Sequence, residues 1–143
     1  MKKILLTIML CGLFIMNGCS RNEFTIGKKS DVVINNNLVS LSVKKETLTN
    51  KGATFILQNN SDKNYYYGEP YNLEVYKNNS WYTINVELNF IEIAYELLVN
   101  DTKEIKINWK NGYGNLVKGK YRIIKNFNSD SETFYASAEF VIE

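Results

Sequence analysis

The chain has 143 residues, with 17 basic and 15 acidic side chains, and 45% of its residues are hydrophobic. This length fits one compact domain. The near balance of charge excludes the strong positive field with which proteins attract nucleic acid or anionic membrane surfaces. The sequence contains no histidine, and both cysteines precede residue 20. We therefore expect no enzymatic activity, no cofactor, no metal site and no disulfide framework.

The first residues predict a secretory signal. Lys2 and Lys3 precede an apolar run of 13 residues from Ile4 to Met16. A membrane-spanning helix needs roughly 20 apolar residues, so this run matches the shorter apolar region of a signal peptide. Loss of Lys2 and Lys3 with that peptide leaves 15 basic and 15 acidic residues in a neutral mature chain.

The residues Met16-Asn17-Gly18-Cys19 resemble a lipobox, although Met16 and Asn17 depart from the leucine and small residue usual there. The resemblance implies cleavage between Gly18 and Cys19, with diacylglycerol and palmitate-type acyl chains attached at Cys19. Two acyl chains anchor a protein stably, at about 0.8 kcal/mol per buried CH₂. We therefore expect an extracytoplasmic protein, lipid-anchored to the cell membrane. The alternative is an ordinary secretory signal with an incidental cysteine.

Three regions follow from this interpretation. Residues 1–18 are the predicted lipoprotein signal peptide. Residues 19–37 are polar and include Asn35-Asn36-Asn37, which favours a flexible tether. Residues 38–143 are the predicted folded domain.

From residue 38 onward, apolar and polar side chains alternate with the period of two that is typical of β-strands. The alternating runs lie at residues 39–43, 53–57, 71–75, 81–86, 105–109, 121–123 and 134–142. Turns rich in Asn, Gly and Asp separate them at intervals of roughly 8 to 12 residues. The pattern predicts an all-β fold, an immunoglobulin-like antiparallel β-sandwich of about seven to nine strands.

Two local features refine this expectation. Tyr121 follows Val117 at the spacing of a tyrosine corner, in which a tyrosine hydroxyl bonds to backbone a few residues upstream. The segment from Val86 to Val99 fits both a helix and a strand, and we favour a strand or extended connection near its end, from Tyr95 to Val99.

A wider pattern resembles a family of bacterial immunoglobulin-like domains that occur in secreted proteins and lipoproteins of Gram-positive bacteria. The likeness covers about residues 38–142 and implies the sandwich fold, but it implies no catalytic or ligand-binding residues. The residues that carry it are Gly68-Glu69-Pro70-Tyr71-x-Leu73-Glu74, Trp81-Tyr82 and Trp109-x-x-x-Tyr113-Gly114-x-Leu116-x-x-Gly119-x-Tyr121-Arg122-Ile123-x-Lys125.

Consecutive tyrosines stand out among the candidate surface residues. Tyr65, Tyr66 and Tyr67 alternate faces if they lie in a strand, so at least one ring faces solvent. Exposed tyrosine is enriched at recognition surfaces. With Tyr76 and Tyr82 these residues form a candidate interaction surface, unless their rings only brace the sheets.

We expect a membrane-anchored interaction domain whose partner is a protein or glycan of the cell envelope, not nucleic acid. The alternative is a carrier or sensor of a small ligand, which needs a cavity between the sheets. A weaker candidate is the oxygen-rich run from Ser129 to Glu132. Its spacing matches no calcium loop, which favours a solvated hairpin.

Overall fold

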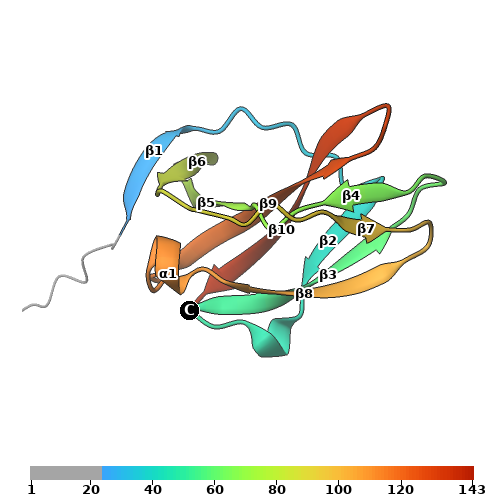
Figure 1. The fold of residues 1–143 in the computed structure, drawn as a ribbon. Coiled ribbons are helices and arrows are strands. Elements are labelled where there is room, and N and C mark those ends of the chain that lie inside the picture. The colour runs from blue at the N-terminus through green and yellow to red at the C-terminus, as the bar shows by residue number, and fades with distance from the viewer. Residues whose placement is uncertain (1–23) are drawn as a thin grey trace, which may run out of the picture.

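The computed structural model describes residues 24–143, which form two layers of β-sheet (Figure 1). Among these residues no helix is long and apolar enough to cross a bilayer. They contain ten strands, the short helix α1 (Lys110–Tyr113) and the 3-10 helix η1 (Lys45–Thr47). The strands are β1 (Thr25–Lys29), β2 (Val39–Val43), β3 (Gly52–Asn59), β4 (Tyr65–Tyr67), β5 (Asn72–Lys77), β6 (Ser80–Asn85), β7 (Tyr95–Leu97), β8 (Thr102–Asn108), β9 (Gly119–Asn128) and β10 (Thr133–Ile142).

The larger sheet has the order β1-β6-β5-β9-β4-β7, and the smaller sheet has the order β2-β3-β8. All pairs of these strands are antiparallel. The long strand β9 pairs with β10 over its whole length, so β5 and β4 share its other edge. The predicted all-β, immunoglobulin-like sandwich is confirmed. The strand count exceeds the expected seven to nine because the structure adds β1 before residue 38.

The core lies between the sheets and is built from the predicted alternation. On β10 the inward side chains are Phe134, Ala136, Ala138, Phe140 and Ile142, and all are buried. Facing them are the buried side chains of the smaller sheet, which include Val39, Leu41, Ala53, Phe55, Leu57 and Ile107. Each large side chain removed from water in this way contributes about 1.5–3 kcal/mol to folding.

The predicted tyrosine corner is present. The Tyr121 hydroxyl donates to the Val117 carbonyl at 2.8 Å. A Cβ atom at Gly119 would lie 3.3 Å from the Tyr121 ring, so glycine permits this close approach. The hydrogen bond fixes where the chain enters β9.

The ambiguous segment from Val86 to Val99 is also settled. Residues 86–94 contain no helix, and β7 follows them in antiparallel pairing with β4. The expectation of a strand near Tyr95 is confirmed. The segment 86–94 runs as an extended loop with few backbone partners of its own.

The structure differs from the predicted tether over residues 24–37. Strand β1 pairs with β6, and the buried Phe24 ring packs edge-on against Tyr121 at 6.3 Å. The chain after β1 then crosses the outer side of the larger sheet, along the top of Figure 1. Asn36 exchanges two hydrogen bonds with the backbone of Ser137, at 2.8 and 3.0 Å. Polar side chains suit this position because the segment lies along the edge of β10 and bonds to its backbone.

The predicted signal peptide, the cleavage point between Gly18 and Cys19, and the lipid attachment at Cys19 lie outside the described residues. So do the residues between Cys19 and Phe24. The predicted tether therefore overlaps the fold from Phe24 onward.

Candidate binding groove between the sheets

The sandwich is closed at one border and open at the other. At the closed border β2 packs beside β10. At the open border β8 is the last strand of the smaller sheet, and it faces β4, β7 and the loop of residues 86–94. A groove of about 770 Å³ lies here, bordered by residues 103–108, 67–69, Tyr71 and 87–90. We refer to it as the β8 groove.

One wall of the β8 groove is a strand edge with unused backbone groups. Within the described chain, β8 pairs with β3 alone. The N–H of Asn59 donates to Asp101 O, and the N–H of Trp109 donates to Lys51 O. Hydrogen-bonded pairs alternate along an antiparallel ladder, so odd-numbered residues of β8 bond to β3. The backbone N–H and C=O groups of the even-numbered residues therefore point into the open border (Thr102, Glu104, Lys106 and Asn108).

Aromatic rings form the opposite wall. Tyr71 contacts Phe90 at a ring-centre distance of 5.5 Å and Tyr113 at 6.0 Å. Tyr67 lies 5.4 Å from Tyr95. Burial raises the pKa of Tyr71 to about 12, so its hydroxyl stays protonated at neutral pH. The wall offers neutral aromatic surface of the kind that holds apolar side chains.

Lys125 lies at the base of the groove, where it is only 3% exposed. Its ammonium donates to the carbonyls of Gly68 at 2.8 Å and Pro70 at 3.1 Å, and lies 5.7 Å from the Tyr67 ring centre. Among residues 24–143 no carboxylate lies within 4 Å of it. Burial lowers the pKa of Lys125 to about 8, against the attraction of Glu69. The groove thus holds a buried cation whose hydrogen-bond acceptors, among the described residues, are two backbone carbonyls.

Charged groups of both signs surround the groove. Glu69 accepts a hydrogen bond from the Tyr95 hydroxyl at 2.5 Å, which raises the pKa of that tyrosine. Lys103 donates to the Glu96 carbonyl at 2.8 Å and so connects β8 to β7. The Lys103 contact therefore joins the two walls of the groove.

The sequence analysis did not identify Lys125 as a groove residue, although the sequence of β9 contains a signal for it. Tyr121, Ile123 and Phe127 occupy the inward positions of β9, and Lys125 interrupts this apolar series. A lysine at an inward position needs partners or a cavity. The sequence does not reveal that it lies beside an open border.

The structure does not bring the five candidate tyrosines together. Tyr65 is fully buried, Tyr67 is 5% exposed in the groove wall, and Tyr66 is 44% exposed on the opposite side of β4. Tyr76 stands against Trp81 at 5.0 Å, and Tyr82 packs against the core. At least one ring of the triplet faces solvent, as predicted, but the five residues form no continuous surface.

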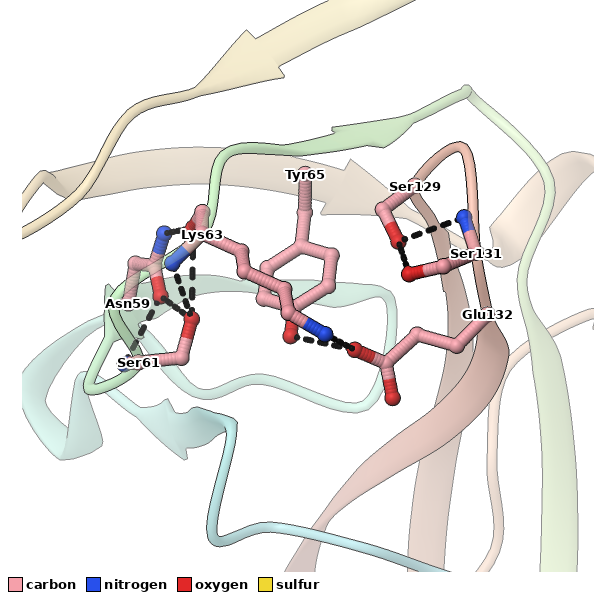
Figure 2. A network of polar contacts seen from close by, with 7 residues as sticks. All are labelled: Asn59, Ser61, Lys63, Tyr65, Ser129, Ser131 and Glu132. Atoms are coloured by element: carbon pink, nitrogen blue, oxygen red, sulfur yellow. Dashed lines mark hydrogen bonds and ion pairs between the residues drawn. The ribbon is translucent and has the colours of Figure 1, made fainter.

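The Ser129–Glu132 run forms a hairpin loop in which Ser129, Ser131 and Glu132 bond to protein groups, as Figure 2 shows. Oε1 of Glu132 accepts hydrogen bonds from Lys63 Nζ and the Tyr65 hydroxyl, both at 3.1 Å. The hydroxyls of Ser129 and Ser131 lie 3.4 Å apart. Within the described residues no group of three or more Asp, Glu, His or Cys side chains is arranged to hold a metal ion.

Asn59 holds the neighbouring loop. Its side-chain amide donates to the carbonyl of Lys63, and its oxygen accepts from the backbone and hydroxyl of Ser61 (Figure 2). The same amide also donates to the carbonyls of Leu97 and Leu98. This asparagine is 1% exposed, and its hydrogen bonds join β3, the 60–64 loop and β7. It therefore fixes the position of β7 at one end of the groove.

Two antiparallel sheets, a tyrosine corner before β9 and a core free of disulfides define this protein as an immunoglobulin-like β-sandwich. The chain belongs to the family described as bacterial Ig-like domain, which matches residues 35–141. No curated protein and no solved structure matches the chain. The family assignment supports an interaction role outside the cytoplasm, and it supplies no site residues.

Proposed function

We propose that the protein is a lipid-anchored extracytoplasmic binding protein that holds an envelope partner in the β8 groove. The groove carries the proposal, because it combines unused backbone groups, aromatic surface and a buried cation in one place. The lipobox-like residues ending at Cys19 support the anchor. The structured segment from Phe24 onward leaves only residues 20–23 between that anchor and the fold, so the domain works close to the membrane surface.

A small-ligand carrier is the second candidate, and the volume of the groove favours it. A space of about 770 Å³ is within the size range of small-molecule sites, roughly 300–1,000 Å³. The long strand edge on one side favours an extended partner instead, because a small molecule leaves most of those backbone groups unused. The proposal includes no catalysis, since the Lys125 amine is hydrogen-bonded to two backbone carbonyls and, among the described groove residues, to no general base.

The anchor is tested by growing cells with an alkyne-labelled fatty acid. We expect the label on the native chain and no label on Cys19→Ala. Labelling of Cys19→Ala, or an unlabelled native chain in the membrane fraction, contradicts the lipoprotein proposal.

The binding role is tested by photo-cross-linking on intact cells. A photoreactive amino acid replaces Asn89, an exposed residue of the groove, or Val33, which is 81% exposed on the far side of the larger sheet. We expect a discrete adduct from position 89 and none from position 33. Equal adducts from both positions, or none from position 89, contradict a binding role for the groove.

A further inference from the structure

We propose that the β8 groove binds an extended peptide, which adds as a strand to the open edge of β8 and places a carboxylate against the Lys125 ammonium. This inference rests on the proposed binding role of the groove and specifies its ligand. Three features of the groove carry it: the buried cation, the strand edge and the aromatic wall.

The buried cation defines the charge of the ligand. An ammonium group has three N–H bonds, and the carbonyls of Gly68 and Pro70 accept two of them. Removal of a charge from water is costly unless the charge is paired. A ligand carboxylate provides the missing counter-charge and an acceptor for the third N–H bond. The lowered pKa of Lys125 is the expected property of a buried lysine that no carboxylate contacts.

The other charged groups around the groove do not supply this counter-charge. Glu69 is the acidic residue whose charge acts on the Lys125 pKa. However, its Oε1 accepts a hydrogen bond from the Tyr95 hydroxyl, and no Glu69 oxygen lies within 4 Å of Lys125. Glu87 and Glu104 also border the groove, as do Lys103 and Lys106. The groove residues thus include three acids and three lysines, and Lys125 is the lysine at the base.

The strand edge defines the backbone of the ligand. Residues 103–108 all border the groove, and the even-numbered residues of β8 direct N–H and C=O groups away from β3. A peptide that adds to such an edge gains main-chain hydrogen bonds at every second residue. Small carboxylates that lack a peptide backbone leave these groups unused.

The aromatic wall defines the side chains. Side chains of a strand alternate between its two faces, so every second side chain of the added peptide faces the interior of the groove. Tyr67, Tyr71 and Phe90 lie on that side. The ligand is therefore an extended peptide with apolar side chains at alternate positions and one carboxylate that reaches the base.

The test uses the full lipoprotein in detergent micelles and a library of random heptapeptides with free carboxyl ends. We expect the selected peptides to share an acidic side chain or to depend on the terminal carboxylate. A Glu→Gln or amidated form of such a peptide should bind roughly tenfold more weakly or worse, since a hydrogen bond to a charged group contributes about 1.5–3 kcal/mol. In Lys125→Met the charged and neutral peptides should bind equally. A selection without enriched peptides, or enriched peptides that need no carboxylate, overturns the proposal.

A second pair of variants tests strand addition without touching Lys125. The N–H of Lys106 points to the open edge, so Lys106→Pro blocks an added strand while the β3–β8 ladder keeps its bonds. Lys106→Thr removes the same side chain and keeps the N–H. We expect loss of peptide binding in Lys106→Pro and retention in Lys106→Thr. Equal binding by both variants overturns strand addition. If position 89 still cross-links a partner when the peptide tests fail, the binding role survives and the ligand class is wrong.

Discussion

The Glu74 carboxylate lies 2.6 Å from the Arg122 guanidinium on the outer side of the larger sheet, yet the two side chains are only 2% and 11% exposed. Glu74 lies on β5 and Arg122 lies on β9. Their neighbours on each strand point into the core, so this pair faces away from it. The segment after β1 covers it. The Ser30 hydroxyl donates to Glu74 at 2.5 Å and accepts from Arg122 at 3.3 Å, and the Trp81 ring lies 4.7 Å from the guanidinium carbon.

Removal of Glu74 therefore leaves an uncompensated charge. We expect Glu74→Ala to lower the free energy of unfolding by about 3–5 kcal/mol, the usual cost of breaking a buried ion pair. Urea unfolding followed by tryptophan fluorescence measures this change. The matched control is Glu139→Ala, whose partner Lys120 lies 2.7 Å away with both side chains about half exposed. An exposed pair contributes about 1 kcal/mol or less, so equal losses in the two variants contradict the argument.

The tyrosine corner gives a smaller, specific prediction. Tyr121→Phe removes the hydroxyl that bonds to Val117 and leaves the ring in place. We expect a loss of about 1 kcal/mol in the free energy of unfolding, which is the net contribution of one hydrogen bond. Tyr66→Phe is the control, because the hydrogen bond from the Tyr66 hydroxyl to Glu96 is long, at 3.4 Å, and lies on the exposed side of β4. A loss in Tyr66→Phe as large as in Tyr121→Phe argues against a special role for the corner.

The sequence predicts those parts of the fold that depend on local pattern. The alternation that ends at Ile142 identifies β10 and its inward face, and Asn78-Asn79 identifies the β5–β6 turn. Both asparagines adopt positive φ, at 48° and 59°, which a two-residue hairpin requires. These features depend on residues that are close together in the sequence, so one amino-acid sequence is enough to predict them.

The remaining features depend on which distant segments meet. Residues 30–37 resemble a linker in sequence, yet in the structure Asn36 bonds to Ser137, the β10 partner of Ile124, and Ile124 on the outer side of β9 is 2% exposed. Tyr65 and Tyr67 are buried because they point to the inner face of the larger sheet, where their rings pack against Phe134 and Phe127. Lys125 borders a groove because β8 ends the smaller sheet. Sequence alternation carries no information about strand order.

Phe24 distinguishes a folded N-terminal segment from a flexible tether. Its ring is 8% exposed and packs against Tyr121. We expect Phe24→Ala to lower the free energy of unfolding by about 3 kcal/mol, as for other large-to-small changes in a core. Val33→Ala, at an 81% exposed position of the same segment, should change it by less than about 0.5 kcal/mol. Urea titration of both variants measures the difference, and an unchanged Phe24→Ala variant supports a tether that extends to residue 37.

Lys125 gives the protein an unusual pH dependence. Its pKa in the folded state is about 8, below the ordinary value of 10.5 that applies in the unfolded chain. Between these values the unfolded state binds more protons than the folded state, so the free energy of unfolding rises with pH. We expect an increase from pH 8 to about pH 10, of order 3 kcal/mol at most, because each pH unit between the two pKa values contributes about 1.4 kcal/mol.

Above about pH 10 the buried tyrosines reverse this trend. Burial raises the pKa of Tyr71 and of Tyr121 to about 12, so the folded state retains protons that the unfolded state loses. The free energy of unfolding should therefore pass through a maximum near pH 10 and fall beyond it. Lys125→Met should remove the rise below pH 10 and keep the fall above it, while Lys118→Met, outside the groove, should keep both. Urea titrations across pH 7 to 11 measure all three chains, and a native profile that is flat from pH 8 to 10 contradicts a buried, uncompensated ammonium.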